Sequence, residues 1–117
     1  MLKRTEKYQF DYLTSSDITD FSKNEQELIA KTIEKAKDAY APYSKFNVSS
    51  GILLTNNQML FGTNVENASY PIGTCAERNV LANCISNCPK DIITTIAVYA
   101  EKDIAKLKTP ITPCGMC

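Results

Sequence analysis

The chain has 117 residues, of which 44% are apolar and 22% are charged, and its 13 basic residues balance 13 acidic ones. This length supports one domain that buries a real core, and it is too short for two. The zero net charge and the absence of a run of about 18 apolar residues argue against a nucleic-acid-binding protein and against a membrane-spanning one.

The first 21 residues are mixed and weakly patterned, so we predict an N-terminal extension over residues 1–21 and a domain over residues 22–117. The basic residues near the start precede no apolar stretch, which is unlike a secretory signal. A cytoplasmic location is therefore the expectation.

The first helix is predicted to begin at a capping box, in which Ser22 and Glu25 satisfy each other's free backbone N–H groups. Apolar residues then recur at three- and four-residue spacing, which predicts an amphipathic helix that ends before Pro42. The buried stripe is expected to consist of Leu28, Ile29, Ile33, Ala36 and Tyr40.

Two strands are predicted next. Residues 46–54 alternate apolar and polar or small side chains, which indicates a strand with one buried face. Residues 55–58 are typical of a turn, and residues 59–65 are predicted to return as the antiparallel partner.

A second capping-box pattern, from Thr74 to Glu77, predicts a second helix that Pro89 closes. Its buried residues are expected to be Val80, Leu81, Cys84 and Ile85. The β-branched run 92–100 predicts a strand that is buried on both faces. The order strand, helix, strand suggests a right-handed crossover, so the chain is predicted to be an α/β domain.

The residue types that are absent narrow the chemistry. There is no histidine, which excludes Ser-His and Cys-His nucleophilic catalysis, and the four glycines form no dinucleotide-binding or phosphate-binding motif. Five cysteines are an odd number in a chain without a secretory signal. Metal ligation or free thiols are therefore favoured over a disulfide framework.

The C-x-x-C pair Cys114 and Cys117 can hold one tetrahedral metal ion, and Cys75 at a distant helix start makes a third ligand. Three thiolates leave the fourth zinc position free for water, which ionises near neutral pH on the metal. A closed four-cysteine site is the alternative. Cys84 and Cys88 lie roughly 13 and 20 Å along the helix from Cys75, so we expect them to pack in the core instead.

Glu77 and Arg78, which follow Cys75, each have a structural interpretation and a catalytic one. Glu77 could only brace the helix start, but next to an open zinc position its carboxylate can move protons between water and substrate, which is the role we favour. Arg78 could be a solvated surface residue. We favour a guanidinium that offsets the negative charge of three thiolates.

These residues stand within four blocks that resemble the small cytidine deaminases, a likeness that covers roughly residues 43–117. The blocks are Tyr43–Val48, Asn64–Gly73, Cys75–Arg78 and Pro113–Cys117. The resemblance implies that the three cysteines are Zn²⁺ ligands and that Glu77 is the proton shuttle, a mechanism that zinc deaminases share.

The same resemblance assigns substrate contacts. Asn64 and Glu66 match a pair that holds the ribose hydroxyls, with turn capping as the alternative. Phe46 matches an aromatic residue against the pyrimidine, although a phenylalanine in an alternating strand is also typical of a core. Tyr70 matches a position near a subunit interface, with a plain loop anchor as the alternative.

The implied fold is a three-layer α/β/α domain with a mixed sheet, which here lacks its C-terminal elements because the chain ends on its last ligand. Small members of this family assemble as homotetramers with shared active sites, so a homo-oligomer is expected. The implied reaction is hydrolytic deamination of cytidine or 2′-deoxycytidine to the uracil nucleoside and ammonia, as in pyrimidine salvage. Zinc-bound hydroxide would attack the carbon that carries the amine while Glu77 protonates the adjacent ring nitrogen.

Three alternatives stay open at this point. The substrate could be blasticidin or another aminopyrimidine, although Asn64 and Glu66 favour a nucleoside. The chain could be a non-catalytic zinc-binding subunit, because it ends at Cys117 and family members continue beyond that motif. Deamination of a base within RNA or DNA is disfavoured by the zero net charge.

Overall fold

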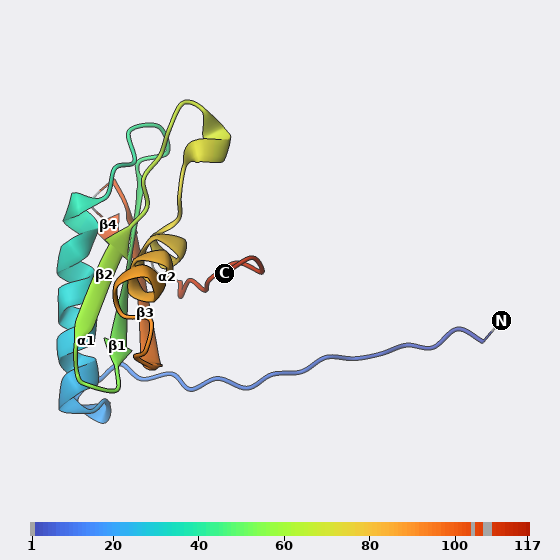
Figure 1. The fold of residues 1–117 in the computed structure, drawn as a ribbon. Coiled ribbons are helices and arrows are strands. Elements are labelled where there is room, and N and C mark those ends of the chain that lie inside the picture. The colour runs from blue at the N-terminus through green and yellow to red at the C-terminus, as the bar shows by residue number, and fades with distance from the viewer. Residues whose placement is uncertain (1, 104, 107–108) are drawn as a thin grey trace.

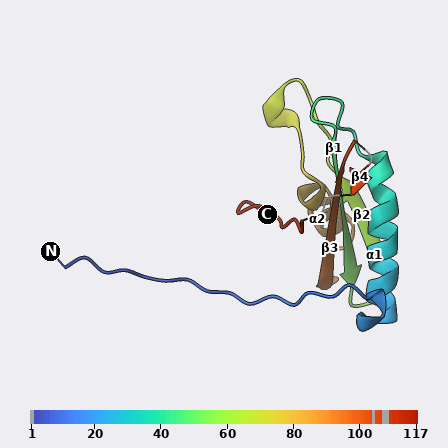
Figure 2. The ribbon, with the colours of Figure 1, turned by 180° about the vertical axis from the view of Figure 1, so that it is seen from behind.

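The computed structural model describes residues 2–103, 105–106 and 109–117. Residues 2–17 form an extended, exposed segment that runs away from the domain (Figures 1 and 2). The helices and strands that follow are η1 (Ile18–Asp20), α1 (Lys23–Lys35), η2 (Ala36–Asp38), β1 (Phe46–Leu54), β2 (Met59–Thr63), η3 (Tyr70–Ile72), α2 (Ala76–Asn87), β3 (Ile93–Lys102) and β4 (Ala105–Lys106).

The sheet lies between the two α-helices, which confirms the predicted α/β/α layers. Its strand order is β2-β1-β3-β4, with α1 against one face and α2 against the other (Figures 1 and 2). The strand pairs that the structure describes are antiparallel, so the parallel pairing of a mixed sheet is not seen in this part. Because β2 and β3 both pair with β1, they run in the same direction, and α2 connects them across β1 as the element order suggested.

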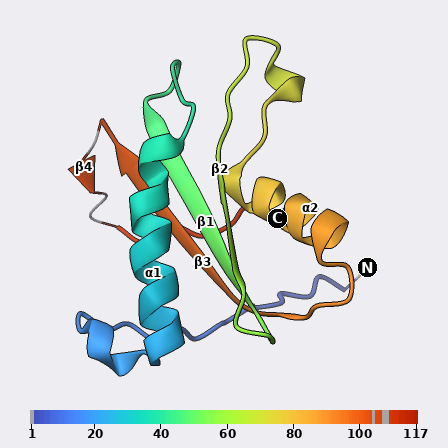
Figure 3. The same cartoon turned by 60° about the vertical axis from the view of Figure 1, so that its left-hand side comes forward.

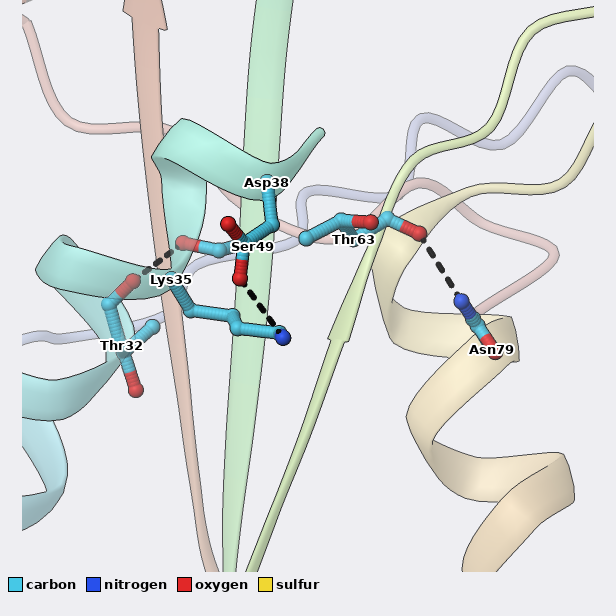
Figure 4. Close-up of polar contacts among 6 residues, drawn as sticks. All are labelled: Thr32, Lys35, Asp38, Ser49, Thr63 and Asn79. Carbon is cyan, nitrogen blue, oxygen red and sulfur yellow. Dashed lines mark hydrogen bonds and ion pairs between the residues drawn. The ribbon is translucent and has the colours of Figure 1, made fainter. Parts of the chain in front are cut away.

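Alternation along β1 gives each helix its own side of the sheet. The face toward α1 is small and polar: the Ser49 hydroxyl donates to the Thr32 carbonyl (Figure 4), and the Asn47 amide donates to the Ala36 carbonyl at 3.3 Å. Thr32 is buried, a position that the apolar pattern did not reveal. Figure 3, with α1 in front, shows this helix lying across the sheet.

The face toward α2 carries the apolar core, a cluster of Ile52, Leu54, Val80 and Cys84, of which each side chain is no more than 1% exposed. Cys88 packs against the edge of this cluster, so both cysteines serve the core as expected. Burial raises the pKa of the Cys84 thiol, which keeps it in the neutral form that an apolar core favours.

The first helix begins at the predicted capping box: Ser22 Oγ accepts from the Glu25 N–H, and the Glu25 carboxylate accepts from the Ser22 N–H at 2.9 Å. Its C-terminal half differs from the prediction. The α-helix ends at Lys35, and Tyr40 lies outside it with 56% of its surface exposed. Ile33 is also at the exposed boundary of the stripe.

Two expected burial patterns on the α2 side are wrong. Helix α2 lies over β2 and β1, so it leaves the same face of β3 uncovered. Ile96 on β3 is therefore 43% exposed, and β3 is not buried on both faces. Ile85 on α2 is 64% exposed, so it is not part of the buried face of that helix. In the part of the chain that the structure describes, no helix is long and apolar enough to span a membrane.

The close packing of α1 on β1 makes Gly51 a sensitive position. A Cβ atom there would overlap Thr32 Oγ1 and would lie 2.9 Å from a ring carbon of Phe61. Gly51→Ala is expected to lower the free energy of unfolding by about 1–3 kcal/mol, because the helix must move away from the strand. Urea unfolding of the metal-free chain measures this. Gly115→Ala, where a Cβ meets nothing within 4 Å, is the control, and equal stability of both variants would contradict the packing.

Candidate metal centre

The start of α2 places two of the candidate residues. Cys75 is the N-cap residue, with φ −82° and ψ 160°, and no side chain caps the helix. The predicted capping box of Thr74 and Glu77 is therefore wrong: the helix begins one residue later, so Cys75 takes the cap position and Glu77 falls at the second helical residue. Glu77 is 7% exposed, and this burial sets it apart from an ordinary helix-start carboxylate.

Backbone contact holds this helix start on the sheet. A Cβ atom on Gly62 would lie 2.8 Å from the Val80 nitrogen and 2.9 Å from the Ala76 carbonyl oxygen, so only glycine lets α2 approach β2 this closely. The Asn79 amide donates to the Thr63 carbonyl at 3.1 Å (Figure 4). The sequence analysis did not identify Gly62 or Asn79. A glycine within an alternating strand pattern was the one signal that could have indicated a close approach of backbones at Gly62.

Three thiols converge where the chain's last residues reach the start of α2. Cys75 Sγ lies 3.7 Å from Cys117 Sγ, and Cys114 Sγ also lies 3.7 Å from Cys117 Sγ. One turn closed by the Cys117 N–H and the Cys114 carbonyl, 2.9 Å apart, brings the C-x-x-C pair together. The structure thus joins residues that are 42 positions apart in the sequence.

The spacing of the sulfur atoms fits zinc. Sulfurs about 2.3 Å from one Zn²⁺ ion at tetrahedral angles lie about 3.8 Å apart, close to both separations here. Ligand atoms of Cys75, Glu77 and Cys117 all lie within 4.8 Å of one another. Cys114 stands at the edge of this group, in contact with Cys117. The donors and their spacing are therefore compatible with a zinc centre.

Electrostatics at the cluster favour a cation. Burial, together with the Cys75 and Cys114 thiols and the charge of Glu77, raises the pKa of Cys117 to about 11. Backbone N–H groups of Cys117 and Met116 lower the pKa of Cys114, because they stabilise its thiolate. The exposed Arg78 forms no hydrogen bond to these sulfurs among the described residues, and its charge-compensating role stays a prediction.

The predicted sugar-binding pair lies on the chain just after β2, and both side chains brace the backbone. Asn64 accepts from the Val48 N–H at 2.9 Å and donates to the Phe46 carbonyl at 2.8 Å. One oxygen of Glu66 accepts from the N–H groups of Tyr43 at 3.0 Å and Ser44 at 3.1 Å. The Asn64 bonds hold the first residues of β1, and the Glu66 bonds hold the segment before it.

The other two candidates differ in exposure. Phe46 is half-buried at the first residue of β1, next to the carbonyl that Asn64 holds. Tyr70 is the first residue of η3 and is 90% exposed. The cysteine cluster and the Phe46–Asn64 group stand on different elements, and the Thr63 carbonyl, bonded by Asn79 and adjacent to Asn64, joins the two.

Sequence comparisons point to one family. The family model "Cytidine and deoxycytidylate deaminase zinc-binding region" matches residues 22–117. A cytidine deaminase of Mycoplasma pneumoniae is 44% identical over 88 residues, which cover 74% of this chain and 62% of that protein. A cytidine deaminase of Halalkalibacterium halodurans is 39% identical over 92 residues, which cover 79% of this chain and 65% of that protein.

Comparison of structures agrees. The crystal structure of a cytidine deaminase from Burkholderia pseudomallei superposes with a TM-score of 0.67 at 35% identity, over 78% of this chain and 68% of that one. The chain spans less than two thirds of the length of the curated relatives named above.

The hydrogen bonds to Glu66 predict how stability depends on pH. Hydrogen bonds from Ser44 lead the causes that lower the folded pKa of Glu66 below its ordinary 4.5. Its contribution to stability is therefore fully present above that ordinary pKa and is lost as the pH falls through the folded value. Compared with wild type, Glu66→Gln is expected to have a lower Tm near neutral pH, with the difference closing as the pH falls below 4.5 and through the lower folded pKa of Glu66.

Thermal unfolding across this pH range measures the effect in the metal-free chain. The matched control is Glu34→Gln on the exposed side of α1, which should show no difference that closes in this way. A Tm difference for Glu66→Gln that stays constant from neutral to acid pH would contradict the role of the carboxylate charge.

Proposed function

Because the chain belongs to the cytidine and deoxycytidylate deaminase family, we propose that it acts in hydrolytic deamination of cytidine or 2′-deoxycytidine. Water adds to the ring carbon that carries the amine, the carbon–nitrogen bond breaks, and the products are the uracil nucleoside and ammonia. The observation that carries this proposal is the mutual approach of Cys75, Glu77 and Cys117 within 4.8 Å. A buried carboxylate stands beside metal-binding sulfurs, as this reaction requires.

Cys75, Cys114 and Cys117 would hold the metal, and their spacing supports zinc. When bound, Zn²⁺ supplies a Lewis acid that makes water a competent nucleophile near neutral pH. Three protein ligands leave one position for that water, which distinguishes a hydrolytic site from a structural one. The two remaining cysteines, Cys84 and Cys88, belong to the core on the α2 side and are not in the cluster.

Glu77 moves the protons. Its carboxylate takes one proton from the attacking water and passes it to the ring nitrogen next to the reacting carbon. It then takes the second proton from the hydroxyl now on that carbon and delivers it to the departing amine, as the carbon–oxygen double bond forms. Its low exposure excludes much bulk water, so proton transfer stays between the carboxylate and the substrate. The chain has no histidine that could do this instead.

The residues proposed to contact the nucleoside are those with atoms that remain available after Asn64 and Glu66 have bonded to the backbone. One oxygen of Glu66 holds the Tyr43 and Ser44 amides, and its second oxygen can accept from a ribose hydroxyl. The Asn64 amide donates to the Phe46 carbonyl, so these two residues are neighbours. This contact supports placing Asn64 at the sugar and Phe46 at the pyrimidine. Arg78 would offset the charge of the thiolates.

The proposal also covers the oligomeric state of the chain and its metabolic role. The 90% exposure of Tyr70 supports a subunit interface at η3, and hence a homo-oligomer such as a tetramer. The partner is a small nucleoside rather than a nucleic acid, in keeping with the zero net charge. A role in pyrimidine salvage follows from the substrate, and the cytoplasmic location stays a prediction.

Glu77→Gln separates catalysis from metal binding. The amide keeps the size of the side chain but cannot accept and release a proton as a carboxylate does, so zinc content is expected to stay at one per chain while kcat falls by about 10²–10⁴-fold. The loss of cytidine absorbance measures turnover, and metal analysis measures zinc. Glu27→Gln, an exposed pair with Lys31 on α1, is the control and should change neither.

Turnover that survives in Glu77→Gln would show that another group moves the protons. A wild-type chain that binds zinc but deaminates neither cytidine nor 2′-deoxycytidine would contradict the proposal and favour a non-catalytic subunit. Turnover of blasticidin in place of both nucleosides would reassign the substrate.

A further inference from the structure

Asn79 occupies a position that the helix does not by itself explain. It lies in the first turn of α2, and asparagine is a poor helix former. Its backbone N–H donates to the Cys75 carbonyl at 3.0 Å, so the two residues stand one turn apart on the same face. The half-buried side chain reaches across to β2 and donates to the Thr63 carbonyl at 3.1 Å (Figure 4).

The acceptor belongs to the peptide group between Thr63 and Asn64. The N–H of that same peptide group donates to the Val48 carbonyl at 3.1 Å, so the peptide is held from α2 on one side and from β1 on the other. The Asn64 side chain then holds Val48 and Phe46. The Asn79 bond thus links the helix turn of the metal centre to the strand ends assigned to the nucleoside.

The contact next to this bond has little directionality. Gly62 of β2 has no side chain, and it faces the Val80 nitrogen, the Ala76 carbonyl oxygen and the Val80 Cβ atom of α2. Such a contact fixes how close the helix lies but not its position along the strand. A hydrogen bond weakens steeply when its length or angle changes, so the Asn79 bond adds a directional constraint to the apolar packing of α2.

We propose that Asn79 is a positioning residue for deamination: its bond to the Thr63 carbonyl holds the turn with Cys75 and Glu77 in register with the nucleoside-binding strand ends. This inference rests on the proposed function and adds a residue that touches neither substrate nor metal. Without the bond, each half of the site remains intact and one is displaced from the other. A displacement of about 1 Å costs on the order of 100-fold in rate.

Asn79→Leu tests this, because leucine has a similar size and no donor. The matched control is Asn83→Leu, one turn later on α2, whose exposed side chain bonds only within the helix. In the zinc-loaded 117-residue chain, Asn79→Leu is expected to lower kcat for cytidine by about 10–100-fold, with KM changed less than about threefold. Zinc affinity from chelator competition and uridine affinity from calorimetry should stay near wild type, and Asn83→Leu should change none of these values.

Two further variants keep the test decisive. Asn79→Gln retains an amide donor and is expected to recover part of the lost kcat. Asn79→Ser removes the amide without adding apolar bulk, and it serves if Asn79→Leu fails to fold, with the same expected fall in kcat.

The inference is overturned if Asn79→Leu, or Asn79→Ser in its place, has the same kcat as the wild-type chain. It is also overturned if zinc affinity and turnover are lost together, which indicates a purely structural role, or if Asn83→Leu loses as much kcat as Asn79→Leu. A wild-type chain without turnover would instead overturn the proposed function, and the inference with it.

Discussion

The close approach of α2 to β2 at Gly62 is the constraint on which the rest of the site depends. With a Cβ atom 2.8 Å from the Val80 nitrogen, any other residue would push the helix outward. The helix start carries Cys75 at its cap and Glu77 at its second residue, so the position of both groups follows from this contact. The apolar cluster of Val80 and Cys84 against β1 secures the helix from the other end.

Three polar side chains connect this contact to the neighbouring strands and loop, mostly by hydrogen bonds to backbone groups. Asn79 holds the Thr63 carbonyl, Asn64 holds the start of β1, and Glu66 holds the segment before it. The metal centre and the assigned nucleoside side are thus parts of one hydrogen-bonded frame. Cys75, Glu77 and Asn64 are therefore held in place by α2 and the strands, whereas Cys114 and Cys117 lie in the segment after β4.

Local signals in the sequence were sufficient for much of the fold. The capping box at Ser22 and Glu25 and the strand over residues 46–54 depend on near neighbours, and both were predicted correctly. The single buried face expected for that strand was wrong, because α1 and α2 cover opposite faces and residues 49–54 are all buried. The exposure of Ile96 was not predicted either, because it depends on which strands α2 covers, and a single strand pattern does not contain that information. The second capping box was wrong because the helix begins one residue later than the Thr74–Glu77 pattern predicts, with Cys75 at the N-cap.

For the site, motif spacing identified the thiols and Glu77, and the structure brings Cys75, Glu77 and Cys117 together. The supporting residues Gly62 and Asn79 escaped notice because their roles are contacts between elements. Zinc K-edge X-ray absorption of the zinc-loaded chain tests the central claim most directly. The account predicts three sulfur ligands at about 2.3 Å and one lighter ligand. Four sulfurs, or a shell without sulfur, would contradict an open site built from Cys75, Cys114 and Cys117.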